Sequence, residues 1–179
     1  LGSVLAVMEN SLSLVLFATA GGFMVPILTS SGDGSHIMLF SYYSLLNLGI
    51  FVVAWYQSWR MLNVVGFLFT FVIATIWGVL RYHSTMFETT EPFLILYFIM
   101  YLTISILFTL KHPFKPKNFV DGTLVFGLPV VAFPLQVNLV KIFEYGEAIS
   151  AVSLATLYLA LFFWLKNKER TYLLAQSFL

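Results

Sequence analysis

Residues 16–28 read LFATAGGFMVPIL and lie within a longer stretch, residues 10–32, that has no charged side chain. The adjacent Gly21 and Gly22 let another backbone approach closely, and Pro26 has no N–H to donate to a carbonyl of the preceding turn. A helix with these breaks would be weak in water. A bilayer tolerates it, because neighbouring helices and small polar side chains satisfy the freed groups. We therefore predict a membrane-spanning helix that other helices contact.

The composition is that of a membrane protein. Hydrophobic residues make up 60% of the chain and charged residues 9%, whereas an ordinary soluble domain has roughly 45–50% and 25%. A soluble fold of this length could not remove so much apolar surface from water. The net charge of +1 and the lack of a basic patch give no indication of a nucleic-acid partner. With no cysteine, disulfides, zinc–thiolate sites and thiol nucleophiles are excluded.

Charged residues divide the chain into uncharged runs of 18–26 residues. Each run is long enough for a helix that crosses a hydrocarbon core of about 30 Å, which takes roughly 20 residues. Runs of about ten residues with period-two alternation, typical of membrane β-barrels, are not present. The predicted fold class is all-α: a polytopic integral membrane protein, one module over residues 1–179, with about six transmembrane helices and short loops. The predicted spans are residues 11–29, 38–57, 62–80, 92–110, 121–140 and 147–165, with Pro92 in the first turn of the fourth.

Lysine and arginine are distributed unequally between the two ends of this predicted bundle. Cytoplasmic loops of membrane proteins carry the excess of these residues. We therefore predict that the side with more lysine and arginine residues, and with it both ends of the segment, faces the cytoplasm. Two of these basic residues, Arg81 and Lys141, lie on the opposite side. The predicted cytoplasmic side has seven: Arg60, Lys111, Lys115, Lys117, Lys166, Lys168 and Arg170.

Two spans contain helix-interrupting residues and are the main candidates for a site. The first contains Gly21, Gly22 and Pro26. The fifth contains Pro129 and Pro134, followed by Gln136 and Asn138. A pair of interrupted spans is a pointer to a transporter site near the bilayer midplane. The alternative is structural: a glycine packing notch, proline kinks, and amides that bond to neighbouring helices.

Two further spans contain small or polar residues at helical spacing. Ser44 and Asn47 are three apart in the second span and share a face. Their default role is interhelical hydrogen bonding, and the alternative is a polar lining for a solute path. In the sixth span Ala148, Ala151 and Ala155 form a small-residue stripe that favours close helix contact.

The interior of each predicted span lacks ionisable residues, which are the usual mark of ion-coupled transport. His36, His83 and His112 fall in loops on both sides of the membrane, so they do not predict one metal site. No catalytic residue, metal ligand or cofactor is predicted from motifs. Four carboxylates on the predicted external side could serve an enzyme if they converged. They are Glu88, Glu91, Glu144 and Glu147.

Several short blocks resemble a bacterial family of predicted membrane proteins, the domain of unknown function 2339. The blocks are residues 21–28 (GGFMVPIL), 30–32 (SSG), 39–42 (LFSY), 45–49 (LLNLG) and 170–178 (RTYLLAQSF). The resemblance implies a bacterial inner-membrane location and a longer protein with further spans. The apolar ends of the chain, each too short to cross a bilayer, agree with that expectation. The resemblance implies no activity, substrate or catalytic residue.

Three functional hypotheses follow. The first is a structural or assembly module of a larger envelope protein, with the bilayer and further spans of the same protein as its partners. The second is part of a transporter or channel, with a polar path near the interrupted first and fifth spans and an unidentified small-molecule ligand. The third is a membrane-embedded enzyme that acts on lipid-linked envelope material. Dry packing around Asn47, Gln136 and Asn138 would favour the first, and a water-filled cavity there the second.

Overall fold

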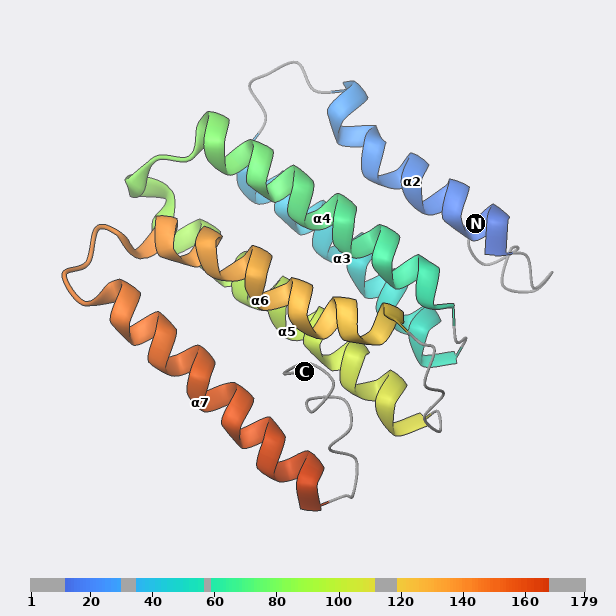
Figure 1. Ribbon diagram of the computed structural model, residues 1–179. Helices are drawn as coiled ribbons and strands as arrows, with labels where there is room; N and C mark the ends of the chain where they lie inside the picture. The colour runs from blue at the N-terminus through green and yellow to red at the C-terminus, as the bar shows by residue number, and fades with distance from the viewer. Residues whose placement is uncertain (1–11, 30–34, 57–58, 112–118, 168–179) are drawn as a thin grey trace.

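The computed structural model describes residues 12–29, 35–56, 59–111 and 119–167, and within these the side chains of Leu12, 108–111, 119–126 and Asn167 are not described. The described residues form an all-helical bundle, which confirms the predicted fold class (Figure 1). The helices are α2 (Leu12–Thr29), α3 (His36–Tyr56), α4 (Arg60–Arg81), the short 3-10 helix η1 (Ser84–Met86), α5 (Phe87–Lys111), α6 (Phe119–Val140) and α7 (Gly146–Asn167).

Length and composition explain why these segments are helices that can lie in a bilayer. Within the described residues, four stretches are long and apolar enough to cross a membrane: His36–Tyr56, Arg60–Arg81, Ser84–Leu107 and Gly146–Lys166. Two shorter apolar helices, Ser13–Thr29 and Gly127–Val140, correspond to the first and fifth predicted spans. In hydrocarbon a helix is favoured because it satisfies its own backbone groups.

The helix boundaries follow the predicted spans within two residues, except at the start of α5. That helix begins at Phe87, five residues before the predicted start at 92. The turn η1 leads directly into it, and the Thr89 hydroxyl donates to the Met86 carbonyl at 3.0 Å. Pro92 therefore lies one turn inside α5, where the missing N–H removes a bond to the Glu88 carbonyl.

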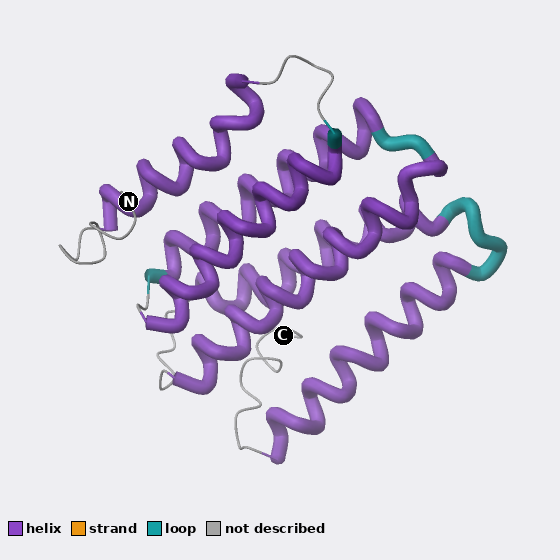
Figure 2. The backbone as a smooth tube through the Cα atoms, turned by 180° about the vertical axis from the view of Figure 1, so that it is seen from behind, coloured by secondary structure: helices purple, strands orange, loops and turns teal. Residues whose placement is uncertain are grey.

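Consecutive helices run up and down, and the two views agree on their arrangement (Figures 1 and 2). The centre is formed by α3, α4, α5 and α6: α5 packs against α3 and α6, and α4 packs against α3 and α6. At one edge α2 contacts α3 and α4, and at the opposite edge α7 contacts α6. The largest fully buried side chains, Tyr43, Tyr97 and Tyr101, come from the central helices.

The helix ends define two ends of the bundle. At one end, called here the α4–α5 end, α2, α4 and α6 finish and α3, α5 and α7 begin (Figure 1). Trp77 and Tyr82 lie there, whereas Trp55 and Trp164 lie at the other end of the bundle. Most of the basic residues behind the predicted orientation, namely Lys115, Lys117, Lys168 and Arg170, fall outside the described residues, as do the loop at 30–34 and the block at 170–178.

Candidate functional site

Pro26 is accommodated in α2 by a donor from the neighbouring helix. The missing N–H leaves the carbonyl of Gly22, four residues earlier, without its helical partner. The Tyr42 hydroxyl on α3 donates to this carbonyl at 3.0 Å. The adjacent Tyr43 hydroxyl donates to the Phe23 carbonyl at 3.2 Å. The helix runs without a break from Leu12 to Thr29. The carbonyl that the proline leaves free is thus satisfied by α3 instead of by α2 itself.

The predicted glycine notch has one open and one contacting position. A Cβ added to Gly21 would have no heavy atom within 4 Å, whereas at Gly22 it would lie 3.4 Å from Leu46 Cδ2. A tighter approach occurs at Gly66 on α4. A Cβ there would lie 2.5 Å from Ile50 Cδ1 and 2.8 Å from the Tyr101 hydroxyl. Gly66 had no distinguishing sequence signal, because one glycine in an apolar run does not indicate which helix it faces.

Asn47 is the centre of a buried polar cluster that joins three helices. Its amide nitrogen donates to the Tyr43 carbonyl at 3.0 Å and to Thr70 Oγ1 at 2.9 Å, and its amide oxygen accepts from the Tyr101 hydroxyl. Thr70 on α4 and Tyr101 on α5 are 3.4 Å apart at their oxygens. Asn47, Thr70 and Tyr101 are each 1% exposed. We call these three residues the Asn47 cluster; its polar groups are partnered by protein atoms.

Ser44 extends these polar contacts toward the α4–α5 end. Its hydroxyl donates to the Phe40 carbonyl at 2.8 Å and lies 3.5 Å from the Tyr97 hydroxyl. Tyr97 on α5 in turn donates to the same Phe40 carbonyl at 2.7 Å. Ser44 and Asn47 therefore lie on the face of α3 that packs against α5.

Gln136 lies elsewhere, in a groove between α5, α6 and α7. Its amide nitrogen donates to Glu91 Oε1 at 2.8 Å. The groove has a volume of about 360 Å³, and Ser150 and Ser153 of α7 also line it. This pairing of a carboxylate with an amide in an otherwise apolar groove was not predicted, because Glu91 was placed in a loop before the fourth span. We call it the Glu91 groove.

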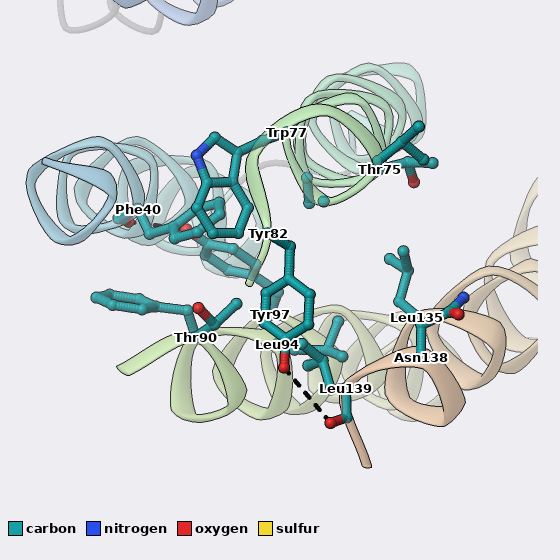
Figure 3. Close-up of a pocket in the computed structure, with 14 residues that line it drawn as sticks. Phe40, Thr75, Trp77, Tyr82, Thr90, Leu94, Tyr97, Leu135, Asn138 and Leu139 are labelled. Atoms are coloured by element: carbon teal, nitrogen blue, oxygen red, sulfur yellow. Dashed lines mark hydrogen bonds between the residues drawn. The ribbon is translucent and has the colours of Figure 1, made fainter. Parts of the chain in front are cut away.

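Asn138 lies on the rim of a second cavity, at the α4–α5 end. It donates to the Pro134 carbonyl at 3.0 Å and accepts from Lys141 Nζ at 2.8 Å. The cavity has a volume of about 230 Å³ and is bounded by α3, α4, α5 and α6. Figure 3 shows Asn138, Leu135 and Leu139 on the α6 side and Phe40, Trp77 and Tyr97 on the other. We call it the Thr90 cavity, after one of the two threonines in its wall.

The Tyr82 hydroxyl closes part of this cavity by donating to the Leu139 carbonyl at 3.4 Å, drawn as the dashed line in Figure 3. Burial raises the pKa of the Tyr82 phenol, and the Glu91 carboxylate raises it further. The phenol is therefore protonated at neutral pH and able to donate this bond.

The remaining predicted residues are placed as follows. Pro129 and Pro134 lie inside α6, which continues through both to Val140. Ala148, Ala151 and Ala155 are exposed on α7, so their contact with another helix stays a prediction. Of the four carboxylates, Glu91 lines the groove described above, while Glu88, Glu144 and Glu147 are exposed. The residues proposed for one polar path thus occupy three places: the face of α3 that carries Ser44 and the Asn47 cluster, the Glu91 groove with Gln136, and the rim of the Thr90 cavity with Asn138.

Comparison with known proteins gives a family but no activity. No curated protein and no solved structure matches the chain. The family model described as "Predicted membrane protein (DUF2339)" matches residues 1–179. The chain therefore belongs to the DUF2339 family of predicted membrane proteins.

Proposed function

We propose that this segment is a helix-packing scaffold within a larger multi-span protein of the bacterial inner membrane. In this proposal both ends of the segment face the cytoplasm, and further spans of the same protein contact its outer helices. The Asn47 cluster is the observation that carries the proposal. It connects α3, α4 and α5 through hydrogen bonds between buried side chains at the centre of the bundle.

The physical argument concerns water. A solute path lined by Asn47 or Ser44 would need polar groups that are accessible to water or to the solute. Asn47, Thr70 and Tyr101 instead bond to one another and are almost fully buried. Interhelical hydrogen bonds in membranes contribute about 0.6–2 kcal/mol each, and their geometry favours one register of the helices over others. The cluster therefore supports a role in holding helices together.

Cysteine accessibility tests this proposal, because the chain has no cysteine of its own. Asn47→Cys and Thr70→Cys are expected to resist a small water-soluble thiol reagent in the folded protein and to react after unfolding. Glu144→Cys, at an exposed position in the turn between α6 and α7, is the reactive control. Labelling of the two buried positions at the rate of the control would overturn the scaffold and favour a solute path.

Membrane orientation is tested separately in intact cells. Glu88→Cys is expected to react with an impermeant reagent added from outside, and Lys115→Cys only after the membrane is permeabilised. The opposite pattern would reverse the proposed topology but leave the scaffold proposal standing.

The Glu91 groove favours a second candidate, a transport or binding role at the α5–α7 side. Gln136 and Glu91 form a hydrogen-bonded pair in a groove of about 360 Å³. In this candidate role, water or a solute reaches these polar atoms. Under this candidate Gln136→Cys reacts with the water-soluble reagent while Asn47→Cys does not. Protection of both positions would remove the candidate.

A further inference from the structure

The Thr90 cavity contains a polar group that the packing of the described helices leaves without a partner. Thr90 lies near the start of α5 and is 8% exposed, and its hydroxyl oxygen makes no hydrogen bond. A buried hydroxyl without a partner costs free energy, so such groups are rare unless something else satisfies them.

Other hydroxyls in the helices show what Thr90 lacks. A threonine or serine in a helix commonly donates to the carbonyl four residues earlier. For Thr90 that carbonyl belongs to Met86, and the Thr89 hydroxyl already donates to it. The Thr90 hydroxyl is therefore available to a molecule in the cavity. Hydroxyls that make the usual bond are those of Thr29, Ser44, Thr75, Thr103, Ser105 and Thr156.

The walls around this hydroxyl are aromatic. The cavity is lined, together with Thr90, by Phe40, Trp77, Tyr82, Phe93 and Tyr97 (Figure 3). Phe40 meets Trp77 edge-on with ring centroids 4.9 Å apart. Aromatic walls favour a flat ring, which can stack on one side chain and meet the edge of another. The cavity volume of about 230 Å³ is sufficient for one substituted ring, since a dry cavity of about 150 Å³ accepts benzene.

Water is a poorer occupant of this space. A buried water molecule needs two to four polar partners. The hydroxyls of Thr75, Tyr82 and Tyr97 already donate to backbone carbonyls. Thr90 therefore contributes a buried hydroxyl without a partner to a mainly apolar cavity. That arrangement matches a ligand with one acceptor on an apolar ring.

We propose that the Thr90 cavity binds a flat, apolar ring with a carbonyl at its edge, the chemical class of a membrane quinone headgroup, and that the Thr90 hydroxyl donates to that carbonyl. An apolar tail would leave the cavity past Val79, which lines it and is 79% exposed. The site is at the α4–α5 end, close to a membrane interface, where a molecule with an apolar tail can enter from the bilayer. This binding is independent of the scaffold role.

Tryptophan fluorescence provides the assay, because quinones quench it and Trp77 is in the cavity wall. Purified protein in detergent micelles is titrated with tetramethyl-1,4-benzoquinone. The chain has four tryptophans, so we expect a saturable component of the quenching, assigned to Trp77, that is lost in Trp77→Phe. Thr90→Val should weaken binding about fivefold to tenfold, as expected for one lost hydrogen bond. Thr103→Val, on the same helix and outside the cavity, is the matched control, and Thr90→Ser should bind as the parent does because it keeps the hydroxyl.

A second probe separates ring recognition from general apolar binding. Tetramethylbenzene has the same shape without carbonyls, and it should compete weakly and equally well in the parent and in Thr90→Val. Competition as strong as that of the quinone would overturn the proposal in favour of an apolar or acyl-chain cavity. The absence of a saturable component, or a saturable component that persists in Trp77→Phe, would also overturn it. If the unfolding midpoints of the variants are unchanged, the weaker quenching reflects weaker binding and not partial unfolding. If Thr90→Val does not fold, Thr90→Ala takes its place.

Discussion

The centre of the bundle and the exposed edge of the Thr90 cavity use similar residues with different results. In the centre, Asn47 bonds to groups on two neighbouring helices and is 1% exposed. At the edge, Asn138 bonds to its own helix and to nearby Lys141, and it is exposed. Asn47 therefore joins helices because hydrogen-bonding groups of α4 and α5 face it, whereas the hydrogen bonds of Asn138 stay on α6 and the turn after it.

Replacing the central amide should have the largest effect. Asn47→Val removes bonds to Thr70 and Tyr101 and leaves their hydroxyls buried, so we expect destabilisation of about 2–3 kcal/mol. The measurement is the unfolding free energy from a titration with denaturing detergent, followed by circular dichroism. Asn138→Val is the matched control at the edge, where we expect a change below about 0.5 kcal/mol. Equal losses in the two variants would remove the difference between centre and edge.

The next effect concerns the close approach at Gly66. Gly66→Ala places a methyl group 2.5 Å from Ile50 Cδ1 and 2.8 Å from the Tyr101 hydroxyl. The neighbours must shift, and we expect a cost of about 1–2 kcal/mol, in the range of overpacked cores. Gly49→Ala, where an added Cβ meets nothing within 4 Å, is the control in the same assay and should be neutral or stabilising. A neutral Gly66→Ala would show that α3 and α4 are less tightly packed than described.

A smaller effect is expected at the proline site. Tyr42→Phe removes the donor to the Gly22 carbonyl that Pro26 leaves free, at a cost of about 0.5–1.5 kcal/mol. Pro26→Ala restores the backbone N–H that bonds to this carbonyl. Tyr42→Phe should therefore lower the unfolding free energy by less in the Pro26→Ala background than in the parent. The coupling between the two changes, measured as a double-mutant cycle, tests the link directly. Tyr56→Phe, with a side chain that is 78% exposed, is the control. Additive effects would mean that Tyr42 does not compensate for the proline.

The smallest effect is expected on α7. Ala151→Leu adds an apolar side chain to a face that is exposed in this segment, so the segment alone should change by less than about 0.5 kcal/mol. Ala132→Leu, at a buried position of α6 that is 5% exposed, should cost about 1–3 kcal/mol. If α7 receives a further helix in the larger protein that we propose, Ala151→Leu should be costly there while remaining neutral in the segment. Neutrality in both forms would leave the alanine stripe facing lipid.

Particular residues show how far the sequence allowed the site to be predicted. Asn47 was identifiable as a group in need of partners, because an amide in an apolar span has no water to bond. The identity of those partners, Thr70 and Tyr101, was not predictable, since it depends on which faces of α4 and α5 meet α3. Pro26 likewise predicted a free carbonyl, while the donor, Tyr42, became evident only from the packing of α2 on α3. Thr90 and Glu91 were missed as cavity residues because α5 begins a turn earlier than Pro92 suggested.

By itself the sequence determined the class of the protein: long apolar runs separated by charges form helices in a bilayer, because only there are both the side chains and the backbone groups satisfied. It also determined roughly where each helix begins and ends. The tertiary structure alone decided which polar residues meet, which face a groove and which hydroxyl is left for a ligand. The physical reason is that helix formation depends on neighbours in the sequence, whereas contact between helices depends on rotation and register, which residues far apart in the chain set together.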